Sequence, residues 1–400
     1  MSYFNRKAGV PPTYLVLSGL LVPERTALEV IAEPEDETEN LRVSTEISAG
    51  AALPPRSAGH SARPRRGNKR RVVFDPTDVG RLADTASRLS RSSERRKLLD
   101  ALLPSLQANP VGMRALCRVP RRLDQHCQLL RQEMPNFGLV IDRIEQWLQL
   151  QRAGDGVFRL PPVLLAGSPG VGKTYFATRL AKLMCVPMEV FSMEVATAFW
   201  VLTGSDPQWS GGATGMIFNL LVHGTAANPT LVVDELDKAS SESRYAPDKA
   251  LYSLLEPGTA RHFRDECCRD LPLDASGINW IFTANDAELI AAPLRSRLVQ
   301  FDIPDLTFDQ RKAVVRCVYR DMRKAESWGH RFDPVPTEKA VDALARGDGS
   351  ARNLRTTLMA AFAGAYDRGS RVIEVCDVVK AVSRSPKVVD LASVEALGHA

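Results

Sequence analysis

Short apolar runs alternate with amphipathic segments through the middle of the chain. The apolar runs cover residues 163–166, 188–191, 231–233, 280–282 and 299–301. The segments between them repeat apolar residues at helical spacing, at 173–184, 213–224, 248–255 and 288–296. Alternation of buried strands and helices is typical of a parallel sheet covered by helices on both faces. We therefore predict an α/β domain over residues 136–303.

The pattern changes after Pro304, where strand-like runs mostly stop. Helical periodicity continues in four segments, at residues 308–327, 337–346, 351–366 and 376–384. These segments predict a separate small helical domain over residues 304–385, followed by a tail at 386–400.

The first third of the chain divides into two segments of different composition. Residues 1–72 contain an acidic patch, an Ala/Pro/Ser stretch and a basic run at 63–71. Such a composition cannot bury enough apolar surface to offset the entropy of ordering, so we predict disorder there. Residues 73–135 space their leucines as helices do, and Pro104, Pro110 and Pro120 interrupt them. They predict a small helical adaptor region that carries no chemistry.

Composition and charge exclude several classes of protein. Hydrophobic residues make up 44% and charged residues 25% of the 400 positions, as in soluble globular proteins. No apolar run reaches the ~18–20 residues that span a bilayer, so we expect no membrane segment. The net charge of +5 is too small to indicate nucleic-acid binding by itself. The basic run at 63–71 could contact nucleic acid or an acidic partner, or it could be a solvated linker.

The seven cysteines are scattered and form no C-x-x-C pair. An odd number of cysteines, dispersed along the chain, argues against a disulfide framework and against a zinc site. It favours a reducing compartment, and we expect a cytoplasmic protein.

One glycine-rich loop carries the signature of a phosphate site. It fits G-x-x-x-x-G-K-[ST], follows the apolar run at 163–166 and opens a helical segment. Its backbone N–H groups and the helix N-terminus would cradle the phosphates of ATP, the lysine would contact the β- and γ-phosphates, and the threonine would bind Mg²⁺. The loop consists of Gly167, Ser168, Pro169, Gly170, Val171, Gly172, Lys173 and Thr174.

Acidic and polar residues follow two other predicted strands. Asp234 and Glu235 end the run that begins at Leu231, where Asp234 can hold the water shell of the magnesium ion and Glu235 can activate the attacking water. Asn285 follows the run at 280–282 and either holds a water or caps the strand in an Asx turn.

These residues together resemble an AAA+ ATPase, and in particular the ATPase module of Lon-type proteases. Residues 234–238 resemble the D-E-I-D-K of that family, and residues 249–257 resemble its A-L-L-E-V-L-D-P. The resemblance covers residues 136–385 and implies a P-loop AAA+ domain with a helical lid. It also implies an adenine-binding segment at Phe137, Gly138 and Leu139.

The resemblance implies three further catalytic positions. Asn285 matches sensor 1, which helps to position the attacking water. Arg297 matches the arginine finger by register with P-L-L-D-R, although Arg295 is an additional arginine two residues earlier. Arg352 matches sensor 2 in a motif with one inserted residue, which leaves Arg355 as the alternative. A finger that reaches the nucleotide of a neighbouring subunit implies a homo-oligomer, and the family implies a hexamer.

Trp209 and Ser210 lie where the family carries an aromatic–aliphatic pair in a loop facing the ring pore. Trp209 would grip an extended protein substrate there, or else would pack beneath its own loop. Lon proteases add a C-terminal peptidase domain, whereas only a short tail follows residue 385 in this sequence. We therefore expect an ATPase that is not a protease by itself.

Three functions fit these features. The first is an ATP-driven remodeller of protein substrates that works as an oligomeric ring. The second is a DNA-associated AAA+ ATPase in replication, plasmid maintenance or defence. The third is a slowly hydrolysing nucleotide switch, against which the presence of both Glu235 and Asn285 argues.

Overall fold

The computed structural model describes residues 14–17, 20–23, 69–108, 111–193, 200–207, 212–238, 248–347 and 351–384. The chain divides into two compact units, residues 1–66 and 67–400. The first unit contains an antiparallel pair of strands, β1 (Tyr14–Leu17) and β2 (Leu20–Pro23). These strands lie inside the segment 1–72 that we expected to be disordered, so the sequence did not predict them. The rest of residues 1–68 and the tail 386–400 lie outside the described residues.

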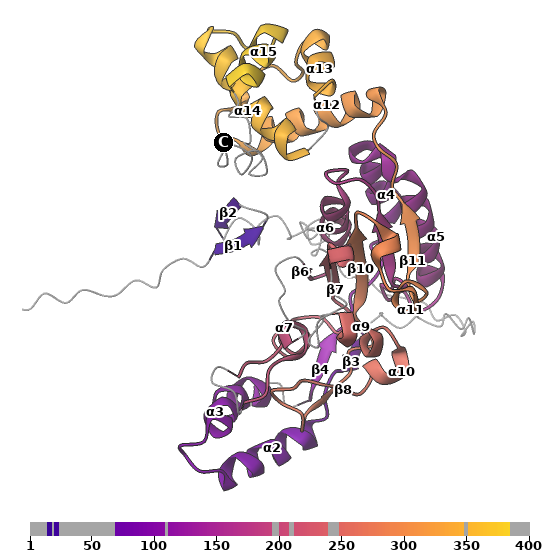
Figure 1. The fold of residues 1–400 in the computed structure, drawn as a ribbon, viewed down its shortest axis with the longest axis vertical. Coiled ribbons are helices and arrows are strands. Elements are labelled where there is room, and N and C mark those ends of the chain that lie inside the picture. Colours follow the sequence, from indigo (N-terminus) through magenta and orange to yellow (C-terminus); the bar gives the residue numbers. More distant parts are fainter. Residues whose placement is uncertain are drawn as a thin grey trace, which may run out of the picture. The chain divides into compact units, whose positions relative to one another are not determined.

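A five-stranded parallel sheet forms the centre of the second unit (Figure 1). Its order is β11–β5–β10–β7–β6, so β5 lies between β11 and β10. Each apolar run identified in the sequence is part of one of these strands, which confirms the predicted α/β fold. The strands are β5 (Val163–Ala166), β6 (Met188–Ser192), β7 (Thr230–Asp234), β10 (Asn279–Ala284) and β11 (Val299–Asp302).

Alternate residues of the strands face opposite sides of the sheet. On one side, Val163, Leu165 and Ile281 pack with residues of α4, α5 and α6 into one hydrophobic cluster. Figure 1 shows these three helices beside the sheet. The helices on this side are α4 (Leu123–Glu133), α5 (Gly138–Ala153) and α6 (Lys173–Leu183), with the 3-10 turn η1 (Pro135–Phe137) between the first two.

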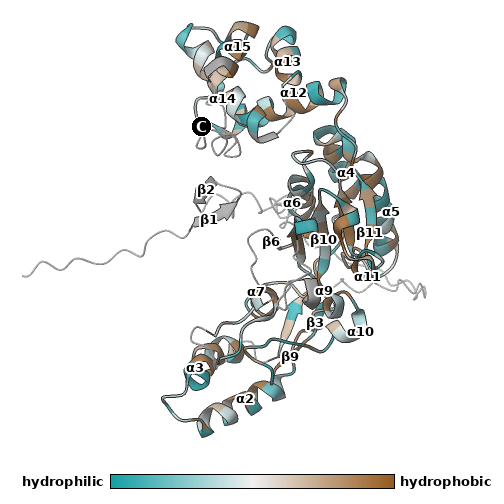
Figure 2. Cartoon of the chain, in the orientation of Figure 1, coloured by the Kyte–Doolittle hydropathy of each residue, from teal (hydrophilic) through white to brown (hydrophobic). Residues whose placement is uncertain are grey.

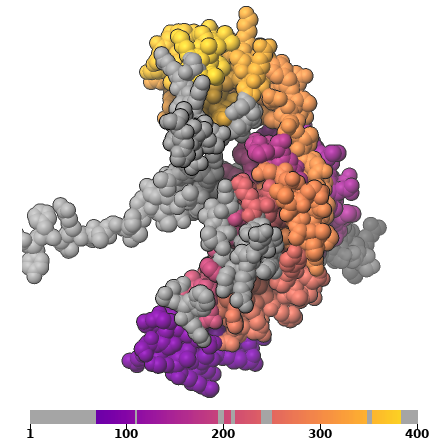
Figure 3. Space-filling model, in the orientation of Figure 1, coloured from indigo at the N-terminus to yellow at the C-terminus, as the bar shows by residue number. Residues whose placement is uncertain are grey.

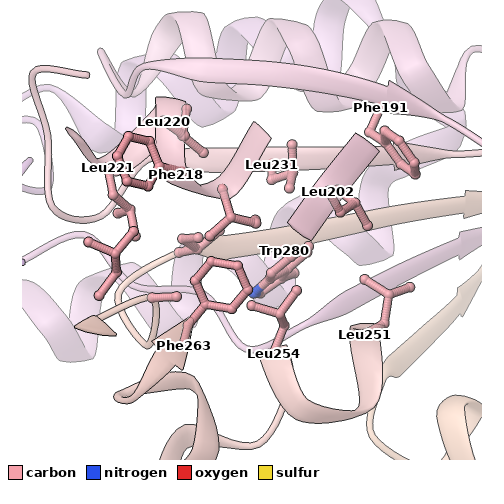
Figure 4. Packing of buried hydrophobic residues seen from close by; sticks show 14 of the residues in the cluster. Phe191, Leu202, Phe218, Leu220, Leu221, Leu231, Leu251, Leu254, Phe263 and Trp280 are labelled. Carbon is pink, nitrogen blue, oxygen red and sulfur yellow. The ribbon is translucent and has the colours of Figure 1, made fainter. Parts of the chain in front are cut away.

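The other side of the sheet is covered by shorter helices. Leu231, Trp280 and Phe282 pack there with residues of α7, α8 and α9. Figure 4 shows Trp280 among Leu251, Leu254 and Phe263 in this cluster. The helices are α7 (Trp200–Thr203), α8 (Met216–Val222), α9 (Asp248–Leu254) and α10 (Pro257–Ala260).

Residues 73–135 do not share a single core. Helices α2 (Pro76–Arg88) and α3 (Glu94–Gln107) bury Leu82 and Leu99 in the same cluster as Trp280, whereas α4 packs on the opposite side of the sheet. The proposed boundary between residues 135 and 136 therefore does not separate two hydrophobic cores. In Figure 3 the indigo atoms of α2 and α3 lie against the segment near residue 270, in agreement with an ion pair between Arg95 and Asp270.

Two short antiparallel pairs complete this region. One joins β3 (Arg70–Val72) to β4 (Met113–Ala115), and the other joins β8 (Phe263–Arg264) to β9 (Pro272–Leu273). The first pair includes the last residues of the basic run 63–71, which the sequence assigned to a linker or a contact surface.

Four helices follow β11 and confirm the predicted helical region. Thr307 and Gln310 form a capping box at the start of the first helix. Tyr319 stacks on Phe362 with ring centroids 5.0 Å apart in the centre of the bundle. Figure 2 shows hydrophobic and hydrophilic residues on each helix, as a bundle with a small core requires. The helices are α12 (Phe308–Ala325), α13 (Glu338–Ala345), α14 (Ala351–Asp367) and α15 (Val375–Arg384).

The remaining elements are one short helix and three 3-10 turns. They are α11 (Ala292–Arg295), η2 (Leu236–Lys238), η3 (Ala287–Leu289) and η4 (Gly329–Arg331). Among the described residues, no helix combines the length and the apolar character needed to cross a bilayer.

Candidate functional site

The loop 167–172 connects the end of β5 to the start of α6. Gly172, the N-cap of α6, has φ +101°, a conformation that only glycine adopts without strain. Gly167 has no room for a side chain, because a Cβ there would lie 2.6 Å from the Ile303 carbonyl oxygen. Residues 168–170 are exposed, so the N–H groups of the loop and of the first turn of α6 are available to an anion.

Lys173 is held between this loop and β10. Its Nζ donates hydrogen bonds to the carbonyls of Gly167 (2.7 Å) and Ser168 (3.1 Å), and to Asn285 Oδ1 (2.9 Å). Burial lowers the pKa of this lysine, and the charges of Asp237, Asp234 and Glu235 oppose that shift. The structure thus brings together the lysine and the asparagine that the sequence assigned to separate motifs.

Thr174 and Asp234 provide adjacent oxygen atoms at the end of β7. The Thr174 hydroxyl donates a hydrogen bond to Asp234 Oδ1 at 2.6 Å. The same carboxylate oxygen accepts a hydrogen bond from the Thr283 hydroxyl on β10. A carboxylate and a hydroxyl at this spacing are the hard oxygen ligands that suit a magnesium ion or its bound water. The residues expected to hold Mg²⁺ therefore fit that ion.

Glu235 directly follows β7 in an unusual backbone conformation. Its φ is +58°, which costs a residue with a side chain roughly 1–2 kcal/mol. Its N–H donates to Thr283 Oγ1 at 3.0 Å, and its carboxylate forms an ion pair of 3.2 Å with Lys238. The turn places the half-buried carboxylate just beyond the carboxyl edge of the sheet, next to Asp234.

Asp237 links the segment after β7 to the segment after β10. Its Oδ2 accepts the backbone N–H groups of Asn285 at 3.1 Å and Asp286 at 3.3 Å. Its Oδ1 is buried and has no hydrogen-bond partner among the described residues. Asp237 belongs to the segment 234–238 that resembles D-E-I-D-K, but the sequence did not predict a role for it.

The proposed adenine segment lies between α4 and α6. Phe137 is fully buried and stacks on Phe176 of α6, with ring centroids 4.5 Å apart, whereas the Leu139 side chain is 78% exposed. Gly138 begins α5 between them. A partly buried bidentate ion pair between Glu133 and Arg179, with both contacts at 2.7 Å, fastens the end of α4 to α6.

The two candidate finger arginines differ in their surroundings. Arg295 forms an ion pair of 2.6 Å with Glu288 and also bonds to the Ala287 carbonyl. Arg297 is exposed, donates to the Pro293 carbonyl at 2.5 Å and lies over the ring of Tyr252. The arginine favoured by register is therefore the more accessible of the two.

Three other predicted residues lie, wholly or by their side chains, outside the described part of the chain. Trp209 and Ser210 lie outside the described residues, and so does the side chain of Arg352, which occupies the second position of α14.

The segment that contains Trp209 is anchored at its two ends. Gly204 and Gly215 both contact Asp265, which is fully buried and accepts the Gly215 N–H at 2.8 Å. Burial raises the pKa of Asp265 to about 7, although its hydrogen bonds to backbone N–H groups oppose the shift.

The sequence missed Thr283 and Asp265. Thr283 is a polar residue inside an apolar strand, two positions before Asn285, and alternate strand residues share a face. That pattern could have identified it. Asp265 has no comparable signal, because its partners Gly204 and Gly215 lie far from it in the sequence.

Known proteins resemble the central part of this chain. Residues 163–304 match the AAA family, described as the ATPase family associated with various cellular activities. The Lon protease of Chloroherpeton thalassium is 26% identical over 281 residues, which are 69% of this chain and 33% of that protein. Lon protease 4 of Sorangium cellulosum is 30% identical over 194 residues, 48% of this chain and 24% of that protein. This chain thus spans a third or less of the length of these relatives.

Solved structures of one further protein also align with the chain. The RuvB Holliday junction branch migration motor of Thermotoga maritima is 19% identical, covers 61% of this chain and 67% of its own, and has a TM-score of 0.43. A point mutant of the same motor is 17% identical, covers 67% and 72% respectively, and has a TM-score of 0.44.

Proposed function

We propose that this chain hydrolyses ATP and uses the energy to remodel a protein substrate in an oligomeric ring, most simply a hexamer, because residues 163–304 match the AAA family. The observation that carries the proposal is a pair of hydrogen bonds at the carboxyl edge of the sheet, from Lys173 to Asn285 and from the adjacent Thr174 to Asp234.

Each residue of this edge has a distinct task. The N–H groups of residue 168 and of residues 170–174 bind the phosphates, and Lys173 exchanges one of its three hydrogen-bond acceptors for a phosphate oxygen. Thr174 and Asp234 hold Mg²⁺, which when bound neutralises charge on the phosphates. Glu235 accepts a proton from the attacking water, and Asn285 orients that water.

The remaining roles require contacts beyond one subunit. Arg297 reaches the nucleotide of the neighbouring subunit, and its exposure leaves it available for that contact. Arg352 approaches the γ-phosphate from the helical lid. Trp209 and Ser210 contact the protein substrate, on a segment whose ends are anchored by Asp265.

We also propose a reducing, cytoplasmic setting. All seven cysteines are free thiols in the described part of the chain, and burial raises the pKa of Cys127, Cys267 and Cys268 to about 12. Thiols of this kind are typical of proteins kept in a reducing compartment.

A turnover assay tests the main proposal. Phosphate release from ATP is measured with the full chain alone, with an unfolded protein and with DNA. We expect hydrolysis that increases with the unfolded protein. The absence of hydrolysis with and without either partner would overturn the proposal, whereas stimulation by DNA alone would favour the second candidate.

The second candidate, a DNA-associated ATPase, is favoured by a basic cluster around the loop that follows α5. We define it as Lys69, Arg118, Arg121, Arg152 and Arg159. Arg118 and Arg159 contact the backbone and the side chain of Asp155 at 3.1 and 2.5 Å, and Arg152 donates to the Arg121 carbonyl at 3.5 Å. The hydrogen bond from Arg159 and, to a lesser extent, the charge of Lys69 lower the pKa of Asp155. Arg118 and Arg159 therefore contact Asp155 directly, and the charge of Lys69 acts on the same acid.

The salt dependence of DNA binding tests this second candidate. The triple variant Lys69→Ala/Arg121→Ala/Arg152→Ala removes exposed cations of the cluster, and Arg261→Ala/Lys324→Ala/Arg346→Ala removes three exposed cations elsewhere. If the cluster contacts phosphates, the first variant alone should lower the slope of log K against log salt, by up to about 3. Equal slopes in both variants would count against a DNA role for the cluster.

A further inference from the structure

The Thr283 side chain hydrogen-bonds to both acidic residues at the end of β7. It is fully buried at the fifth position of β10. Its hydroxyl donates to the Asp234 carboxylate, and its oxygen accepts the Glu235 N–H at 3.0 Å. One hydroxyl group therefore contacts the residue assigned to Mg²⁺ and the residue assigned to water activation.

The direction of these hydrogen bonds is fixed by chemistry. An ionised carboxylate can only accept, and a backbone N–H can only donate, so the hydroxyl must point its hydrogen at Asp234 and its lone pair at Glu235. Each bond polarises the other, which strengthens both. Thr174 donates to the same oxygen of Asp234 and completes the orientation of that carboxylate.

The contact to Glu235 acts at a residue whose left-handed backbone conformation is unfavourable by itself. The Glu235 N–H is held by Thr283, and the φ of +58° at the adjacent N–Cα bond sets the direction of the side chain and of the chain that follows. Without an acceptor at Thr283, this N–H would lose its partner and the conformation would lose a contact that maintains it. The direction of the Glu235 carboxylate depends on that conformation.

We propose that Thr283 is a positioning residue for ATP hydrolysis, which orients Asp234 and holds Glu235 in its left-handed conformation. The inference rests on the proposed ATPase function. It assigns no contact between Thr283 and the nucleotide, because the hydroxyl is used by the two acidic residues.

A second buried threonine provides a matched control. Thr230 lies on the neighbouring strand β7, is 1% exposed and has a hydroxyl without a hydrogen-bond partner among the described residues. Valine has the shape of threonine without the hydroxyl. Thr230→Val therefore removes no hydrogen bond, whereas Thr283→Val removes two.

The experiment compares Thr283→Val, Thr283→Ser and Thr230→Val in the full chain. The measurements are kcat for ATP, the Kd of ADP and the melting temperature.

We expect Thr283→Val to lower kcat by about 10- to 100-fold, because a misplaced catalytic group lowers the rate by about this factor. The Kd of ADP should stay within about twofold, since Lys173 and its loop are untouched. Thr283→Ser keeps the hydroxyl and should recover most of kcat, and Thr230→Val should equal the wild type.

Several outcomes would overturn the inference. A wild-type kcat in Thr283→Val would do so, as would equal losses in Thr283→Val and Thr230→Val, or a serine variant no more active than the valine variant. Thr283→Ala gives a second variant without the hydroxyl if the valine variant does not fold, and the same loss of kcat is expected. If the wild type itself hydrolyses no ATP, the proposed function fails and this inference fails with it.

Discussion

Lys173 donates a hydrogen bond to Asn285 at 2.9 Å, although 112 positions separate the two residues in the chain. The other two protons of the ammonium group point to the carbonyls of Gly167 and Ser168. All three donors are therefore in use, and a phosphate oxygen that binds Nζ must replace one of these acceptors. If the phosphate oxygen replaces Asn285 as an acceptor of Lys173, the amide oxygen of Asn285 becomes available to a water molecule. Phosphate binding would then be linked to the positioning of that water.

Replacing Lys173 with alanine should abolish nucleotide binding or turnover. The variant removes the ammonium group that contacts the phosphates and also the partner of Asn285. Titration with a fluorescent ADP and a phosphate-release assay measure the two effects. Lys182→Ala, on an exposed lysine of the same helix, should behave as the wild type. Turnover at the wild-type rate in Lys173→Ala would exclude the proposed phosphate site.

Glu235→Gln should separate binding from chemistry. The amide cannot accept the proton of the attacking water, and general-base catalysis contributes typically ~10²–10⁴ in rate. ATP affinity should be retained, because the phosphate contacts come from other residues. Light scattering with ATP should also reveal a ring in this variant, since bound nucleotide stabilises the assembled state. Loss of both ATP affinity and hydrolysis rate in Glu235→Gln would mean that Glu235 has a structural role. Glu256→Gln removes the charge of an exposed glutamate elsewhere and serves as the control.

Arg297 should act across a subunit interface. Arg297→Ala should bind ATP but be inactive alone, and Lys173→Ala should also be inactive alone. Rings mixed from both variants contain interfaces where an intact pocket faces an intact arginine, so part of the activity should return. No recovery in rings shown to contain both variants would exclude a role in trans. Arg295→Ala should be less affected, because Arg295 is paired with Glu288.

The buried carboxyl of Asp265 should make stability depend on pH. Burial raises its pKa from 3.8 to about 7, so between these values the folded protein keeps a proton that the unfolded chain has released. The stability contributed by Asp265 should therefore fall as pH rises from 4 to 7 and stay level above that.

Melting temperatures at several pH values check this expectation. The advantage of the wild type over Asp265→Asn should shrink as pH rises toward 7 and then remain constant. Asp305→Asn, which replaces an exposed carboxyl, should not reproduce that curve. A difference between wild type and Asp265→Asn that is constant across the whole range would contradict the assignment.

The sequence predicted the parts of the fold that depend on local pattern. Val163–Ala166 is apolar throughout and lies between two strands, so its composition alone indicates a buried strand. The β3–β4 pair was missed because its strands are short and their partners lie far apart, as with Arg70 and Ala115. Arg71 was misjudged for the same reason. Its place in the basic run 63–71 suggested an arginine exposed to solvent, but it forms an ion pair of 2.6 Å with Asp274, far away in the sequence.

The candidate site divides in a similar way. Lys173, Thr174, Asp234 and Glu235 belong to motifs whose spacing reflects one loop and one strand end, so the sequence identifies them. The residues that orient them act between strands, and spacing along the chain cannot indicate which hydroxyl or carboxylate faces which partner. Thr283 on β10 bonds to Glu235 directly after β7, and Asp237 in η2 bonds to Asn285 directly after β10.

The shared core of α2, α3 and the sheet has a consequence for synthesis of the protein. Arg95 on α3 pairs with Asp270, 175 positions later, and Leu99 is buried in a cluster that includes Leu271. A ribosome adds roughly 5–20 residues per second, so α3 emerges about 10–35 s before the segment that covers it. During that interval its leucines are exposed on the nascent chain, and α2 and α3 must be shielded from aggregation until the strands that bury them have been made.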